Sequence, residues 1–156
     1  VDELIQDDEA PPTDPMRTGS AASLIAWQDL GKRGRWFVST GPTAAEIGAF
    51  VGTAVPEPLR IYVGLNAAAT PEARARLALR ELIRVGGFER SVLVLVTPTG
   101  TGWVDPAAFD PLEFLHRGDV ASVAAQYSYL PSPLALIAED AYGAETARAL
   151  FEEVYG

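Results

Sequence analysis

The residues best suited to chemistry follow a short apolar run near the middle of the chain. Val92 to Val96 are all aliphatic, and such a run, bounded by polar residues, predicts a strand buried on both faces of a sheet. Thr99–Gly102 (Thr-Gly-Thr-Gly) follows it closely. Glycines and hydroxyl residues at the carboxyl end of a buried strand suit a loop whose N–H groups face a ligand, because open α/β sheets bind ligands at that edge. A tight, well-capped turn without a ligand explains the same residues, and both interpretations stay open.

Few other side chains could do chemistry. His116 is the single histidine, and its place at the end of a predicted helix is explained better by the helix dipole than by a role as general base. The chain has no cysteine, and no group of His, Asp and Glu has metal-ligand spacing, so we expect no metal and no cofactor. Ser128 lacks flanking glycines and is expected to be a loop hydroxyl.

Phosphate-binding motifs are missing from the sequence. Gly100 and Gly102 could begin a dinucleotide-binding loop, but the third glycine would fall at Asp105, whose charge opposes a pyrophosphate. This disfavours a nucleotide-binding domain, and without a basic stripe we expect no nucleic-acid partner. The basic residues of segment 32–35 are expected to form a solvated face, with a phosphate or lipid-headgroup patch as the alternative.

The elements that position the loop belong to one ordinary globular domain. The chain has 156 residues, of which 48% are hydrophobic, and this is enough for a sizeable core. Its net charge is −9, but six of the 21 acidic residues stand within the first 14 positions. We therefore predict a flexible acidic linker over residues 1–19 and a folded domain over 20–156. No apolar run approaches the roughly 18 residues of a membrane span.

Capping patterns and apolar periodicity predict the order of the elements. Thr43 and Thr70 are expected N-caps, and Asp105 and Asp110 are each expected to start a helical turn before a proline. Strands are predicted over 60–65, 92–96 and 120–127, and helices over 43–50, 71–85, 106–117 and 143–155. Alternation of strands and helices predicts an α/β fold, a three-layer αβα arrangement with a mainly parallel sheet.

Two apolar stripes are expected to face the core. They are Ala75, Leu79, Leu82 and Ile83 in one helix, and Ala147, Leu150, Phe151 and Val154 in the last one.

Segments 60–65, 96–106 and 126–132 resemble a known family. They are similar to the α/β-hydrolase domain of bacterial membrane proteins, of actinobacterial and proteobacterial type, in which several membrane helices precede a soluble hydrolase-like domain. The resemblance covers about residues 20–156, and its most specific parts are Thr-Pro-Thr-Gly-Thr-Gly-Trp and Tyr-Ser-Tyr-Leu-Pro-Ser. It implies a partial α/β-hydrolase fold. It also implies a soluble chain that is membrane-associated through segments outside it, with the side of the membrane left open.

The resemblance implies a serine hydrolase that acts on a small-molecule or lipid-like acyl ester. The nucleophile, in a Gly-x-Ser-x-Gly-like elbow, and its acid and histidine are expected downstream of residue 156, so no catalytic residue is assigned here. The loop would supply oxyanion-binding N–H groups, and aromatic and hydroxyl residues would line the pocket. The oxyanion candidates are Thr99, Gly100, Thr101 and Gly102, and the pocket candidates are Trp103, Tyr127, Ser128 and Tyr129. The alternative is a non-catalytic module that binds a ligand or partner through the same loops.

The resemblance also implies a partner for the sheet. In the usual hydrolase order, the nucleophile strand pairs beside the strand at 91–97, and without it an apolar edge stays unpaired. We therefore expect that edge to be covered by the remaining half of the hydrolase domain, by another chain, or by self-association.

Overall fold

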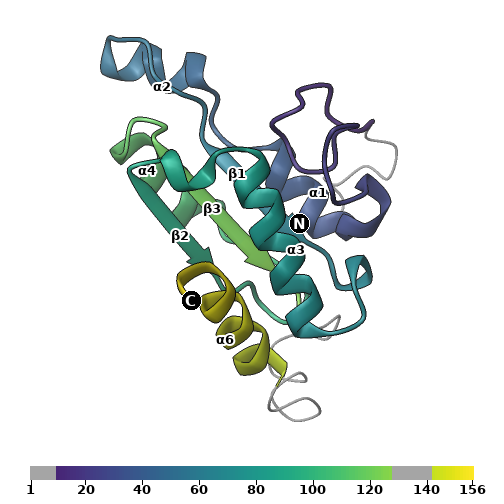
Figure 1. The fold of residues 1–156 in the computed structure, drawn as a ribbon. Coiled ribbons are helices and arrows are strands. Elements are labelled where there is room, and N and C mark those ends of the chain that lie inside the picture. Colours follow the sequence, from purple (N-terminus) through teal and green to yellow (C-terminus); the bar gives the residue numbers. More distant parts are fainter. Residues whose placement is uncertain (1–9, 128–141) are drawn as a thin grey trace.

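The computed structural model describes residues 10–127 and 142–156 (Figure 1). Three parallel strands of the described residues form one sheet in the order β1-β3-β2, so the third of these strands along the chain lies between the other two. The predicted α/β fold with a parallel sheet is confirmed. The strands are β1 (Leu59–Val63), β2 (Val92–Val96) and β3 (Val120–Ala125).

Helices α1 (Gly31–Ser39), α3 (Pro71–Arg84), α4 (Pro106–Leu115) and α6 (Tyr142–Tyr155) cover the two faces of this sheet. Helix α2 (Ala44–Val51) lies beyond one end of the sheet (Figure 1). Short 3-10 turns span Trp27–Leu30, Leu65–Ala67 and Gly87–Glu89. Helices α3 and α6 pack against each other on one face (Figure 1). Side chains that alternate along β1 contact α1 and α4, which places these two helices on the other face.

The helix starts follow from local sequence as predicted. The side chain of Thr43 accepts a hydrogen bond from the N–H of Glu46, and that of Thr70 accepts from Ala73. Asp105 caps α4 in the same way, ahead of a proline at the first helical position. The second start predicted at Asp110 is wrong, because α4 runs on through Pro111 and the Asp110 carboxylate binds an arginine instead.

Burial corrects three of the sequence-based expectations. Every residue of β2 is half-buried, not buried on both faces as predicted. Both β1 and β2 are outer strands, but β1 is fully buried and its Arg60 carbonyl accepts from Thr18. No described strand pairs with the outer edge of β2. Ile83 and Phe151, assigned to core stripes, are 60% and 56% exposed. The buried side of α3 is instead turned to include Arg74 and Glu81.

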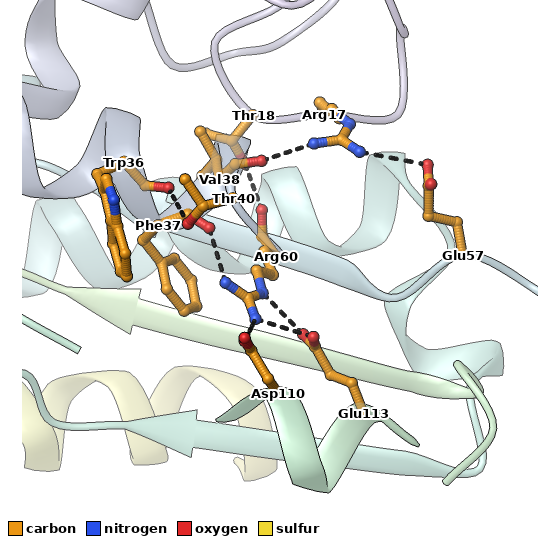
Figure 2. Close-up of polar contacts among 10 residues, drawn as sticks. All are labelled: Arg17, Thr18, Trp36, Phe37, Val38, Thr40, Glu57, Arg60, Asp110 and Glu113. Carbon is orange, nitrogen blue, oxygen red and sulfur yellow. Dashed lines mark hydrogen bonds and ion pairs between the residues drawn. The ribbon is translucent and has the colours of Figure 1, made fainter. Parts of the chain in front are cut away.

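Residues on both sides of the predicted linker boundary at residue 19 contact the domain. Thr18 and Ser20 are buried, and the hydroxyl of Thr18 donates to the carbonyl of Arg60. The guanidinium of Arg17 donates to the carbonyl of Val38 (Figure 2). The segment next to residue 20 therefore packs on the body of the domain.

The side chain of Arg60 connects β1 to α1 and α4 on one face of the sheet (Figure 2). Its guanidinium donates to both carboxylate oxygens of Glu113 at 2.7 and 2.8 Å, to Asp110 at 2.8 Å and to the carbonyl of Phe37 at 3.0 Å. Burial alone would lower the pKa of Arg60, but the hydrogen bonds and charges of Glu113 and Asp110 raise it. The guanidinium therefore stays charged inside the protein and joins β1 to both helices.

We predict that Glu113→Gln destabilises the fold far more than Asp110→Asn. The Glu113 side chain is fully buried, whereas that of Asp110 is 41% exposed. Removing one member of a buried pair costs roughly 3–5 kcal/mol, whereas an exposed ion pair contributes about 1 kcal/mol or less. Urea denaturation of the two isosteric variants measures the difference, and equal losses would contradict the role assigned to burial.

Candidate functional site

The Thr97–Val104 segment lies where the connections of neighbouring strands leave toward opposite faces of the sheet. From β2 the chain continues into α4 on one face, and α6, the next described helix after β3, lies on the other (Figure 1). In open α/β sheets a crevice forms outside the carboxyl ends of two such strands, and ligands bind there. The structure therefore places the predicted loop at the edge of the sheet where a site is expected.

The loop itself is a tight turn closed by its own hydrogen bonds. The N–H of Gly102 donates to the carbonyl of Thr99 at 2.8 Å, and the N–H of Thr99 donates to the carbonyl of Trp103 at 2.9 Å. The hydroxyl of Thr99 accepts from the N–H of Trp103 at 3.2 Å. In the described part of the chain, no hydrogen bond engages the N–H of Thr101. Most of the hydrogen bonds of this backbone are thus formed within the turn, and the N–H of Thr101 is the donor best placed to bind a ligand.

One side chain from β1 and one from the residue directly after β3 hold the turn in place. The hydroxyl of Tyr62 in β1 donates to the carbonyl of Gly102 at 2.8 Å, and the side-chain amide of Gln126 donates to the carbonyl of Thr101 at 3.3 Å. Tyr62 and Gln126 are both buried. Gly102 has a φ of +87°, and a Cβ there would lie 2.3 Å from the Tyr62 hydroxyl oxygen. The second glycine of the motif is therefore required by backbone conformation and by close packing.

Trp103 ties the loop to α1. Its ring stacks on Trp36 with centroids 4.6 Å apart, and the guanidinium of Arg33 lies 4.8 Å from its centroid. Stacking and cation–π contacts of this kind fix the orientation of an indole ring. The structure thus gives Trp103 a docking role, and its assignment as a pocket residue stays a prediction.

Two cavities flank this edge of the sheet. A cavity of about 200 Å³ is lined by Thr101, Gln126 and the start of α1, including Lys32 and Arg33. A larger one of about 620 Å³ lies beyond the carboxyl ends of β1 and β3 and is lined by Tyr127 and Arg74, among others. Thr101 and Tyr127, both named from sequence, therefore border cavities, whereas Ser128 and Tyr129 lie outside the described residues.

The opposite, amino-terminal edge of the sheet carries the histidine. His116 is the C-terminal cap of α4, as predicted, and it precedes β3. Nearby, the hydroxyl of Ser91 donates directly to the carboxylate of Asp119. A catalytic serine needs a base between itself and the acid, so these residues form a structural contact.

Sequence reasoning missed three residues that shape the site edge: Tyr62, Arg74 and Gln126. Tyr62 and Gln126 lie in the segments 60–65 and 126–132 that carry the family resemblance, but neither was given a functional role. No signal in the sequence shows that they reach the loop. Arg74 lies outside the predicted apolar stripe of its helix, yet it is only 5% exposed. Among residues 10–127 and 142–156, no three His, Asp or Glu side chains gather as metal ligands would.

Comparison with known families gives two matches. Residues 59–156 match a family described as "Alpha/beta-hydrolase family", and residues 1–42 match one described as "Alpha/beta-hydrolase family N-terminus". The first match covers more than half of the chain. The chain belongs to the alpha/beta-hydrolase family. Searches of curated proteins and of solved structures found no match.

Membership in the alpha/beta-hydrolase family agrees with the observed architecture. The matched region begins at the first residue of β1 and contains the whole described sheet and the Thr97–Val104 segment. The parallel sheet between helical layers fits part of a three-layer hydrolase-like fold. None of the helices in residues 10–127 and 142–156 has the length and apolar character of a membrane span.

We predict that Gly102→Ala is more damaging than Gly52→Ala. Both glycines have positive φ, +87° and +80°, but a Cβ at Gly52 meets nothing within 4 Å. The left-handed backbone costs each alanine about 1–2 kcal/mol, and displacing Tyr62 should cost Gly102→Ala about 1–3 kcal/mol more. Urea denaturation checks this order, and equal losses would show that the turn yields to a side chain at no cost.

Proposed function

We propose that this alpha/beta-hydrolase chain supplies the oxyanion-binding side of a serine hydrolase site that cleaves acyl esters. The observation that carries the proposal is the position of the Thr99–Gly102 turn. It follows an outer strand of a parallel sheet, at the edge where such folds hold their ligands. Family membership makes ester hydrolysis by a serine nucleophile the chemistry to test first.

Thr101 is the residue of the turn best suited to the role. When a serine oxygen attacks an ester carbonyl, the carbonyl oxygen becomes negative, and preformed N–H donors stabilise it. The N–H of Thr101 has no acceptor among the described residues, and Thr101 borders a cavity beside Lys32 and Arg33. Cationic side chains there favour developing negative charge. Gln126 and Tyr62 keep the turn rigid, so donor and oxyanion need little reorganisation.

The nucleophile, its base and its acid belong to segments outside the described residues in this proposal. None of the described strands pairs with the outer edge of β2, and an unpaired edge is a ready template for another strand. We propose that a further strand of the hydrolase domain, or a second copy of the chain, pairs there. Membrane association through other segments, and a small-molecule or lipid-like ester substrate, belong to the same proposal.

Replacing the Thr101 amide by an ester tests the oxyanion role directly. Incorporating the α-hydroxy acid analogue of threonine at position 101 of the intact protein removes one N–H and keeps the side chain. We expect kcat for p-nitrophenyl butyrate to fall about 100-fold or more, with an unchanged circular dichroism spectrum. Thr101→Ala, which keeps the N–H, is the matched control and should stay within about threefold.

A serine-reactive phosphonate tests the reaction class in the same protein. Covalent labelling of one serine, together with ester hydrolysis, is the expected result. Absence of both would overturn the hydrolase proposal.

A non-catalytic binding module is the second candidate. The observation that favours it is that three N–H groups of the turn, those of Thr99, Gly102 and Trp103, are already used within it. Under this alternative the phosphonate does not label the intact protein. The amide and ester forms at position 101 should then hydrolyse p-nitrophenyl butyrate equally slowly.

A further inference from the structure

Arg74 is a buried cation whose hydrogen bonds are incomplete. It lies in the first turns of α3 and is 5% exposed. Its Nη1 donates to the carbonyl of Ala68 at 2.9 Å, but its Nε is buried without an acceptor. A guanidinium presents five N–H donors, and withdrawing it from water without matching acceptors is costly. The side chain is therefore arranged for a partner that the described residues do not provide.

Arg60 is a second buried arginine in this chain, and its contacts are structural. Arg60 is 8% exposed, a burial close to that of Arg74. Its guanidinium binds two carboxylates and one carbonyl, and these carboxylates raise its pKa. The pKa of Arg74 is shifted in the opposite direction. Burial lowers its pKa, and the charge of Glu72 opposes this without any hydrogen bond between the two.

The Arg74 side chain lines the cavity of about 620 Å³ at the carboxyl ends of β1 and β3. Asn66 and Thr70 from the β1–α3 connection, Tyr127 after β3, and Glu145 of α6 also line it, together with small apolar residues. No hydrogen bond is formed by the Tyr127 hydroxyl within the described part of the chain. The cavity thus combines a buried cation, a hydroxyl donor and an apolar wall.

We infer that this cavity binds the carboxylate of a small aliphatic acid, with the guanidinium of Arg74 as its anion-binding group. The planar fork of an arginine matches a carboxylate in a two-point hydrogen-bonded pair. The apolar wall suits a short hydrocarbon chain. Glu145 at the same cavity and Glu72 beside Arg74 add negative charge, which repels a dianionic phosphate more strongly than a singly charged carboxylate. This site does not depend on the hydrolase proposal, since neither Thr101 nor a nucleophile takes part.

Titration of the intact protein with hexanoate tests the inference. We expect saturable binding by isothermal titration calorimetry, at least tenfold weaker binding of hexanamide, its neutral analogue, and no saturable binding of inorganic phosphate. Arg74→Met should weaken hexanoate binding at least tenfold. Without hexanoate, the same variant should unfold at a denaturant concentration equal to or above that of the unmodified protein, because an uncompensated buried charge is removed.

Arg76→Met is the matched control on the same helix. The Arg76 side chain is 59% exposed and faces Glu153 at 3.9 Å, so this variant should bind hexanoate within twofold of the unmodified protein. Equal hexanoate binding by Arg74→Met and the unmodified protein would overturn the inference, and so would hexanamide binding as tightly as hexanoate. Saturable binding of phosphate in place of hexanoate would overturn the assignment to a carboxylate. Ester hydrolysis measured on Arg74→Met separates the two proposals, because loss of hexanoate binding with retained hydrolysis leaves the Thr101 proposal intact.

Discussion

The hydrogen-bonded guanidinium of Arg60 is the interaction on which the architecture depends most. It joins β1 to Glu113 and Asp110 of α4 and to the Phe37 carbonyl of α1 (Figure 2). The carbonyl of the same residue accepts from Thr18, so the segment before residue 20 is held as well. A Cβ at Gly41 would lie 2.6 Å from the Arg60 Nε, which explains a glycine at that close approach. The need to satisfy one buried cation thus fixes β1, α1 and α4 relative to one another, and the backbone of the same residue holds the segment before residue 20.

Strand order then determines where a ligand can bind. The chain passes from β1 to the far strand β2 and returns to the middle strand β3. Because parallel crossovers are right-handed, this reversal places α3 and α4 on opposite faces. The connections diverge at the carboxyl ends of β2 and β3, and the Thr97–Val104 segment lies there. Tyr62 reaches that segment from β1, so the same sheet that separates the helices also holds the loop.

The elements were predictable from sequence because their signals are local. Capping by Thr43, Thr70 and Asp105 depends on residues two or three positions away, and the apolar run 92–96 marks β2 within its exact bounds. Burial was less predictable. An apolar run does not reveal what covers its strand: β1 and β2 are both outer strands, yet β1 is fully buried and β2 is half-buried.

The buried charged residues were not predicted, since charge alone indicates exposure. Arg60, Arg74, Glu81 and Glu113 are all buried, and a partner decides each case. Glu81 accepts from Ser23, from the N–H of Leu24 and from Arg84, and although burial opposes it, these contacts lower the pKa of Glu81. Partners so distant in sequence have no local signature. For this reason the loop of the candidate site was predicted, while the residues that hold it were not.

The buried charges divide into two kinds, and the division follows the two edges of the sheet. Arg60, near the amino end of β1, and Glu81, on α3, are satisfied by the chain itself. Arg74 lies against the cavity beyond the carboxyl ends of β1 and β3, and its Nε lacks an acceptor. A protein gains stability by completing hydrogen bonds to buried charges, so an incomplete set persists at a cost. The incomplete set at Arg74 lies at the edge where α/β sheets bind ligands. A hydrogen-bond donor without an acceptor can recognise a ligand there.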